Sequence, residues 1–325
     1  MKGKDGLSVR DKDREREVKK AYKRLALERG LDQSLAVKIA DLLMTDSVRI
    51  QTRKSANDLD GMKALVIGGS GRMGAWFCRR LSNRGAAVRV WDPRGKLDGY
   101  QSVRDLKTAA RESDIVVLSS PLGVAPGELK LVLAARPTGL VFDVCSVKSH
   151  IAKQLRAAAR SGVKVASIHP MFGPNIPTPR GRTIIVCDCG SAEGNALIQQ
   201  LISGTGAKVV KMSLEQHDRL MSYVLGLPHL VLLAFARTLE GSEESLHSLR
   251  SVQGPSFERM LAASRELSRE SVRVYHDIQA LNPNTKAMFA NFVNSVKFLK
   301  NASIQKDPEA FRKIMESNRK YLEVR

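Results

Sequence analysis

The first sixty residues carry two helical patterns of apolar and polar positions. Over 13–29 the apolar residues recur at the i, i+3, i+4, i+7 spacing of one helix face. Gly30 is a stop signal, and Asp32 is placed to cap a second helix that runs to about Gln51. A polar linker follows over 52–61. We therefore predict a helical hairpin, whose second helix is expected to bury Leu35, Ile39, Leu42 and Leu43.

From Met62 the pattern changes to short apolar runs that alternate with amphipathic stretches. Continuous apolar runs separated by helices are typical of a parallel sheet that is covered on both faces. After Ser213 the strand patterns stop and helical patterns continue to the end. The predicted strands are 64–69, 87–92, 114–121, 139–146, 163–170 and 183–188. The sequence thus predicts a helical segment over 1–57, a doubly wound α/β Rossmann domain over 58–213 and an all-helical domain over 214–325.

Composition places the chain among ordinary globular proteins. It has 325 residues, of which 43% are hydrophobic, so wholesale disorder is excluded. The 53 Lys and Arg against 33 Asp and Glu give a net charge of +20, which is compatible with a polyanion partner. No Lys/Arg block resembles a nucleic-acid-binding arm, so we do not expect a nucleic-acid partner.

Targeting signals and metal-binding patterns are not evident in the sequence. The first residues have no apolar core of a signal peptide, and no apolar run reaches the ~18 residues that span a bilayer. We therefore expect no membrane partner. The cysteines are few and scattered, which favours a reducing cytoplasm. Cys187 and Cys189 supply only two thiols, so no metal site is expected.

A glycine-rich turn follows the first predicted strand and opens a helix. In this context the G-x-G-x-x-G spacing predicts a dinucleotide site, because the glycines allow close approach to the pyrophosphate and the helix N-terminus offers N–H donors. The alternative is a tight turn without a ligand. The predicted cofactor residues of the turn are Gly69, Ser70, Gly71, Arg72, Met73 and Gly74.

Further cofactor contacts are expected at two strand ends. Asp92 ends the second strand and is placed to accept hydrogen bonds from the ribose hydroxyls, which favours NAD. Arg94 would tolerate a 2′-phosphate, so NADP stays open. Ser120 and Pro121 end the third predicted strand, at the edge where such sheets bind ligands.

Two candidate catalytic residues lie at strand ends of the same predicted sheet. His169 ends one strand and Ser146 ends another. A histidine there is suited to general-base work near neutral pH, although a strand-end histidine is more often a packing residue.

Several motifs together resemble prephenate dehydrogenase. They are the glycine-rich turn, DVCSVK (143–148), IHPMFGP (168–174), QHD (216–218), LPH (227–229) and the helical tail from 291. The resemblance implies a homodimer that oxidises prephenate with NAD and releases CO2. It implies that His169 accepts the 4-hydroxyl proton and that Ser146 orients His169. His229 would line the pocket, and His217 is expected to support helix packing.

The resemblance departs from the family at one substrate-binding position. The family uses an arginine of the helical domain to bind the ring carboxylate, and a gapless comparison places Glu266 there. Arg265 is the first choice for this role and Arg269 the second. Either could instead be an exposed helix residue.

The N-terminal segment resembles the second and third helices of the chorismate mutase that is fused to this enzyme in some bacteria. The residues that match the mutase pocket are Asp11, Arg14, Glu15, Ser47 and Gln51. The family's long first helix is not found ahead of them. Mutase activity and a hairpin used only for association are therefore both open.

Three other functions are alternatives to that of a prephenate dehydrogenase. A hydroxy-acid dehydrogenase of the same architecture would carry a catalytic lysine in its helical domain, and no such signature is present. An arogenate dehydrogenase would share every motif. A basic regulatory protein on a Rossmann shell would leave His169 and Ser146 without a role.

Overall fold

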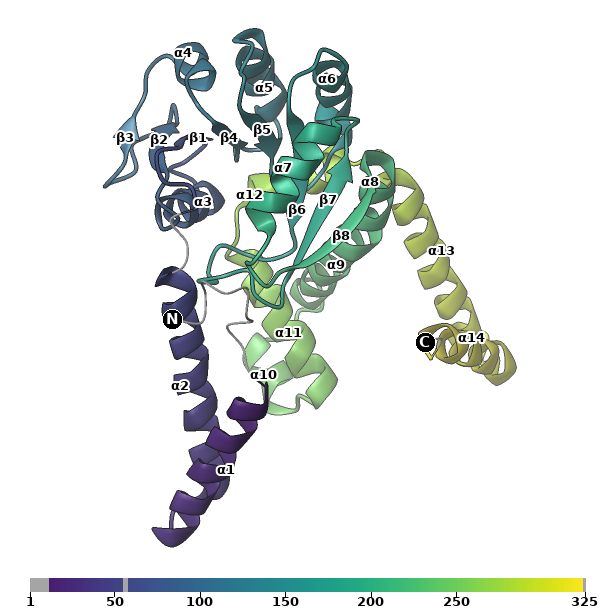
Figure 1. The fold of residues 1–325 in the computed structure, drawn as a ribbon. Coiled ribbons are helices and arrows are strands. Elements are labelled where there is room, and N and C mark those ends of the chain that lie inside the picture. The colour runs from purple at the N-terminus through teal and green to yellow at the C-terminus, as the bar shows by residue number, and fades with distance from the viewer. Residues whose placement is uncertain (1–11, 55–57, 324–325) are drawn as a thin grey trace. The chain divides into compact units, whose positions relative to one another are not determined.

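The computed structural model describes residues 12–54 and 58–323 (Figure 1). The chain forms two compact units. Unit 1 runs as far as Val117 and includes Pro137–Gly139, and unit 2 consists of Leu118–Arg136 and Leu140–Arg325. These units divide the chain at other places than the predicted domain boundaries, which therefore stay predictions.

The N-terminal hairpin is confirmed. Helices α1 (Lys12–Glu28) and α2 (Gln33–Lys54) contact each other, and Asp32 Oδ1 accepts a hydrogen bond from Leu35 N at 2.7 Å. The predicted burial was wrong, because the α2 face turned toward α1 is the one that carries Ala40, which is fully buried. The four residues expected in the core are instead exposed: Leu35 by 56%, Ile39 by 44%, Leu42 by 71% and Leu43 by 52%.

Unit 1 contains the first half of the α/β region. Its strands follow the order β3-β2-β1-β4, and β2 is parallel to both of its neighbours. Strand β3 was not predicted, because two exposed residues give no apolar pattern. The elements are β1 (Lys63–Ile67), α3 (Arg72–Ser82), β2 (Ala87–Trp91), β3 (Gln101–Ser102), α4 (Leu106–Arg111) and β4 (Ile115–Leu118), whose last residue belongs to unit 2.

Unit 2 contains the second half, with strand order β5-β6-β7-β8. Strand β7 is antiparallel to β6, so the prediction of a parallel sheet was wrong there. The connection over 171–182 contains no helix, and a chain without a crossover helix turns back beside the strand it has left. The elements are α5 (Ala125–Ala134), β5 (Leu140–Asp143), α6 (Ser149–Arg160), β6 (Val165–Pro170), β7 (Thr183–Asp188), α7 (Ala192–Ile202) and β8 (Lys208–Ser213).

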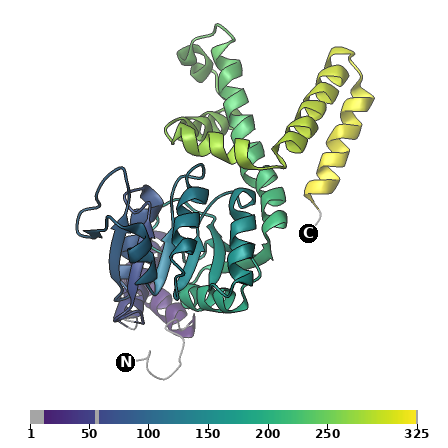
Figure 2. The same cartoon turned by 90° about the horizontal axis from the view of Figure 1, so that it is seen from above.

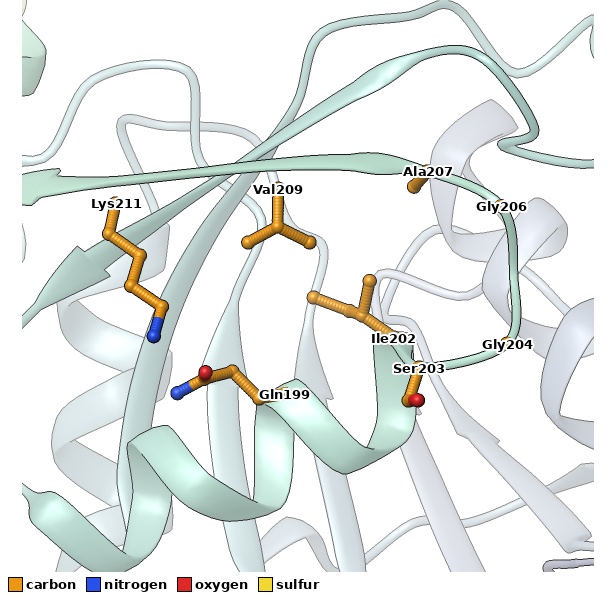
Figure 3. A pocket seen from close by; sticks show the side chains of 8 residues that line it. All are labelled: Gln199, Ile202, Ser203, Gly204, Gly206, Ala207, Val209 and Lys211. Atoms are coloured by element: carbon orange, nitrogen blue, oxygen red, sulfur yellow. The ribbon is translucent and has the colours of Figure 1, made fainter.

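Strand β8 was not predicted either. It is parallel to β7 and ends the strand order of unit 2. Its lysines, Lys208 and Lys211, interrupt the apolar run, as is common in edge strands. A hollow of about 720 Å³ lies between β8 and α7 (Figure 3). None of the predicted site residues lines it.

The remaining part of unit 2 is helical, as predicted (Figure 2). A π-helical segment, η1 (Ser222–Gly226), joins α8 to α9 and directly precedes Pro228. Gln279 Nε2 donates to Gly226 O at 2.7 Å, which satisfies a carbonyl in the irregular turn. The helices are α8 (Leu214–Met221), α9 (Leu227–Glu240), α10 (Leu246–Ser251), α11 (Pro255–Ser268), α12 (Val272–Leu281), α13 (Thr285–Ile304) and α14 (Pro308–Leu322).

One helical run is long and apolar enough to cross a membrane by length and composition alone. It is Leu214–Glu240, where η1 joins two helices into one, and 17% of its most apolar window is buried. The expectation that no segment would reach this length was therefore wrong. The run also holds the buried polar residues His217 and Asp218.

Helix α7 packs against β6 through a glycine. A Cβ atom at Gly194 would overlap the backbone of Val165. Gly127 lies within α5 and has open space around it. Only the first glycine is therefore required by packing.

We predict that Gly194→Ala lowers the free energy of unfolding by about 1–3 kcal/mol or more, because backbone must move apart. Gly127→Ala is the matched control and should be neutral or stabilise the helix by about 1 kcal/mol. Urea unfolding followed by circular dichroism measures both. Equal effects of the two substitutions would contradict the packing argument.

Candidate active site

The glycine-rich turn of unit 1 has the geometry that a dinucleotide needs. A Cβ at Gly74 would overlap the carbonyl oxygen of Gly68, so only glycine lets α3 approach β1 this closely. The N-cap residue of α3 is Gly71, and no side chain caps the helix. The positive end of the α3 helix dipole therefore lies at this turn and favours a phosphate group there.

Asp92 lies beside this turn. Its side chain is 1% exposed, and its carboxylate accepts hydrogen bonds from Ser70 N at 3.2 Å and from Arg94 N at 3.0 Å. The Arg94 side chain is 61% exposed, with Nε 3.6 Å from Asp92 Oδ1. The residues predicted to select between NAD and NADP thus lie together at the turn, and the residues present fit a dinucleotide.

The loop after β4 belongs to unit 2 and holds the other predicted cofactor residues. Ser119 Oγ and Ser120 Oγ are both buried, and neither has a hydrogen-bond partner. Pro121 follows them and is half-buried. Buried hydroxyls without partners are uncommon and need an explanation, and a bound ligand supplies one.

His169 stands at the end of a chain of buried hydrogen bonds. Its Nδ1 lies 2.9 Å from His217 Nε2, and His217 Nδ1 lies 2.8 Å from Asp218 Oδ1. All three residues are buried, with 5%, 0% and 1% exposure. His169 is the penultimate residue of β6, while the other two lie on α8, so the chain connects the sheet of unit 2 to its helices.

The protonation states follow from these contacts. Burial and then His217 hold the pKa of His169 well below its usual value. Burial also lowers the pKa of His217. Although burial acts to raise the pKa of Asp218, hydrogen bonds from His217 and from two backbone N–H groups bring it below its usual value.

With both histidines neutral and Asp218 ionised, only one assignment of donors and acceptors fits the two hydrogen bonds. His217 donates from Nδ1 to Asp218, so its Nε2 accepts from His169 Nδ1. The Nε2 atom of His169 then carries the unprotonated lone pair. The arrangement supplies a neutral base at a fixed position, which is the property that proton transfer requires.

The turn from β5 to α6 holds this chain in place. Asp218 accepts from Lys148 N at 2.8 Å and from Ser149 N at 2.7 Å. The fully buried Lys148 Nζ lies 2.6 Å from Asp143 Oδ1 and donates to Ile168 O at 2.7 Å. Although burial opposes it, Asp143 raises the pKa of Lys148. Lys148 was missed as a site residue, although it lies within the DVCSVK motif.

The structure gives His169 a different partner from the predicted one. Ser146 is half-buried, and no hydrogen bond joins it to His169 in the described chain. His217 takes the orienting position instead, a role that the expectation of helix packing did not include. The sequence signal was the QHD motif, whose histidine and aspartate both take part.

The predicted substrate-binding residues lie on the helices of unit 2. The His229 ring on α9 contacts that of Tyr275 on α12 at a centroid distance of 4.4 Å and a tilt of 60°, and His229 Nδ1 is buried without a partner. Burial lowers the pKa of His229. Arg265 lies in the last turn of α11 and Arg269 caps it, and both are exposed. Their role in binding stays a prediction.

The remaining predicted sites are only partly described. Within residues 12–54 and 58–323, no group of three metal-binding side chains is found. Of the mutase-like pocket, Arg14 is exposed and Glu15 is half-buried. Asp11 lies outside the described residues, as do the side chains of Ser47 and Gln51.

Comparisons with known proteins agree with this site. The prephenate dehydrogenase nucleotide-binding domain matches residues 97–211, and the prephenate dehydrogenase dimerization domain matches 213–317. The chain is 31% identical over 236 residues to a 4-amino-4-deoxyprephenate dehydrogenase of Streptomyces pristinaespiralis, covering 69% of this chain and 79% of that protein.

Two further relatives extend the comparison. The chain is 30% identical over 267 residues to a probable arogenate/prephenate dehydrogenase of Methanocaldococcus jannaschii, covering 79% of this chain. It spans 60% of that relative's length. The prephenate dehydrogenase structure from A. aeolicus, at 21% identity, superposes with a TM-score of 0.66 over 82% of this chain and 99% of that one.

The two matched domains together cover most of the α/β and helical parts, and the relatives carry the same activity class. The chain therefore belongs to the prephenate dehydrogenase family of NAD(P)-dependent oxidoreductases.

Proposed function

We propose that this protein oxidises prephenate with NAD and releases CO2, giving 4-hydroxyphenylpyruvate. The observation that carries the proposal is the buried Asp218–His217–His169 chain, which leaves His169 Nε2 as an unprotonated base. The reaction needs such a group, because the 4-hydroxyl of prephenate must lose its proton as hydride leaves C4. NAD supplies the hydride acceptor, and the glycine-rich turn and Asp92 would hold it.

The residues of this chain account for the proton movements. His169 Nε2 takes the hydroxyl proton while the C4–H bond breaks toward the acceptor, and C4 becomes a carbonyl carbon. The carboxylate bond on the ring then breaks, its electron pair enters the ring, and CO2 leaves. The former C4 carbonyl oxygen receives a proton, which His169 can return, and the ring is aromatic.

The environment keeps His169 ready for this cycle. Burial, and then His217 and Lys148, disfavour a resident proton on the His169 ring. When the ring takes a proton in the reaction, its Nδ1–H remains bonded to His217, and His217 in turn to Asp218. A carboxylate at the end of the chain stabilises the transient cation without competing for the substrate's proton.

The choice of substrate within the family is also a proposal. The relative from M. jannaschii is named for arogenate and prephenate, and the relative from S. pristinaespiralis for 4-amino-4-deoxyprephenate. These compounds share the ring carboxylate and differ at the side chain or at C4. A base that accepts a proton from a hydroxyl group favours prephenate and arogenate over the 4-amino compound, and of these two we propose prephenate because the matched family domains are those of prephenate dehydrogenase.

We further propose a homodimer in the cytoplasm. The dimerization-domain match covers α8–α14, where large apolar side chains are exposed in the single chain. They include Leu220, Tyr223, Val224, Leu233 and Phe298. A second copy would cover such a face, including that of the run Leu214–Glu240. All four cysteines are free and buried, which is compatible with a reducing compartment.

The function is tested by offering prephenate, arogenate and 4-amino-4-deoxyprephenate, each with NAD and with NADP, while the absorbance of reduced nicotinamide is followed. We expect the highest kcat/KM for prephenate with NAD. No turnover with any pair would refute the proposal. Chorismate with NAD in the same assay tests the mutase-like segment, since reduced nicotinamide then forms only if prephenate is produced first.

We predict that His169→Asn lowers kcat by about 10²- to 10⁴-fold, because the general base is lost. The affinity for NAD should stay within twofold, measured by fluorescence titration. His247→Asn, at an exposed histidine of α10, is the matched control and should retain wild-type activity. Full activity of His169→Asn would show that another group is the base.

A second prediction concerns pH. His169 works as a base only when it is unprotonated, and its pKa is well below its usual value of 6.5. The acid limb of the kcat/KM profile should therefore have its midpoint below pH 6.5. Because His217 is one cause of the lowering, His217→Asn should move this midpoint upward and also reduce kcat. A wild-type midpoint at or above pH 6.5 would contradict the assignment.

A further inference from the structure

Helix α12 presents one face to the start of α6 and to the loop after β4. Arg273, Asp277 and Leu281 follow one another at i, i+4 and i+8, so they lie along one side of the helix. Ser149 Oγ at the start of α6 donates to Leu281 O at 3.1 Å. At the other end of this face, a Cβ atom at Gly123 would lie 3.3 Å from Arg273 Nη2. The face therefore runs from α6 to the loop after β4.

The guanidinium of Arg273 lies on this face, and its ion pair leaves hydrogen-bond donors unused. Its side chain is 57% exposed, and its ion pair is with Asp277, whose Oδ2 lies 3.8 Å from Nε. That distance is longer than a hydrogen bond, so the Nε–H and the outer Nη donors are not used by it. The Asp277 carboxylate also lies 3.1 Å from His276 Nδ1, so Arg273 and His276 share the negative charge of Asp277. The guanidinium is thus positioned but can still bind a ligand.

His150 lies at the start of α6, next to Ser149, whose Oγ is bonded to Leu281 of α12. Both of its ring nitrogens are buried, and neither has a hydrogen-bond partner. Burial lowers the pKa of His150, and Asp277 is among the charges that act on the ring. A neutral imidazole without partners loses its hydrogen bonds to water on folding, and it regains one when a ligand binds.

The sequence lacks an arginine at the position where the family resemblance places the group that binds the ring carboxylate. The family's ring-carboxylate arginine is replaced by Glu266, and the nearby Arg265 and Arg269 lie on the exposed side of α11. The buried face of α11 is formed by Leu261, Ser264 and Leu267. Arg273 lies instead on α12, the helix whose Tyr275 contacts the His229 ring.

We propose that Arg273 of α12, together with His150 of α6, binds a carboxylate of the dianionic substrate in place of the missing family arginine. A guanidinium binds a carboxylate through two parallel N–H donors, and a neutral histidine adds one further donor. Asp277 keeps the guanidinium in position. The inference rests on the proposed function, because it takes prephenate as the ligand.

Steady-state kinetics of the full chain test the assignment. Arg273→Gln should raise KM for prephenate by about 10- to 100-fold, which corresponds to the loss of hydrogen bonds to a charged group, with KM for NAD unchanged. Arg273→Lys should lie between it and the wild type, because charge is kept and the paired donors are lost. Arg259→Gln, at an exposed arginine of α11, is the charge-matched control and should leave KM unchanged.

His150→Phe separates ligand binding from a structural role. Replacing a buried unpartnered polar ring by an apolar one of similar shape should not lower the thermal midpoint. We nevertheless expect KM for prephenate to rise several-fold. An unchanged KM would remove His150 from the site.

Three results would overturn the proposal for Arg273. They are a KM for prephenate within twofold of wild type in Arg273→Gln, a large effect in Arg265→Gln or Arg269→Gln instead, and a rise in KM for NAD in place of prephenate. Calorimetric binding of prephenate to His169→Asn, with and without Arg273→Gln, gives a readout that does not need turnover. If the wild type fails to turn over prephenate, the proposed function fails, while calorimetry still decides whether Arg273 binds this dianion.

Discussion

The carboxylate of Asp218 is the group on which the site depends. It accepts from His217 Nδ1 and from the backbone N–H groups of Lys148 and Ser149. Taking an ionised carboxylate out of water costs several kcal/mol unless such donors surround it. These bonds join α8 to the turn between β5 and α6. The same group therefore fixes the helices on the sheet of unit 2 and fixes the tautomer of the base, so binding and chemistry share one geometry.

The buried pair of Lys148 and Asp143 extends this arrangement to β6. Lys148 Nζ bridges Asp143 Oδ1 and Ile168 O, the carbonyl just before His169. A buried ion pair adds little net stability, but removing one partner leaves an uncompensated charge. Its contribution here is positional, since it joins the ends of β5 and β6. The residue also keeps positive charge near the His169 ring, which favours the neutral form of the base.

The sequence predicted local elements better than their arrangement. Six apolar runs were recognised as strands because continuous hydrophobicity is a local property. The reversal of β7 depends on the connection over 171–182, and β8 carries Lys208 and Lys211 on an edge, so neither followed from periodicity. His169 was identified by its motif. Its partner was not, because His217 lies 48 residues away and the two meet only when α8 packs on the sheet.

The choice of the carboxylate-binding arginine shows the same limit of prediction from sequence. A gapless comparison considers positions along one helix, and Glu266 therefore directed attention to Arg265 and Arg269. The structure adds information that an alignment lacks. Arg265 and Arg269 are not on the buried face of α11, whereas α12 brings Arg273 close to Gly123. Buried polar atoms without partners also occur on loops and helices of unit 2, among them those of Ser119, Ser120, His150 and His229. Each such atom costs stability in the folded protein, and a polar, anionic ligand is the kind of molecule that would supply a partner.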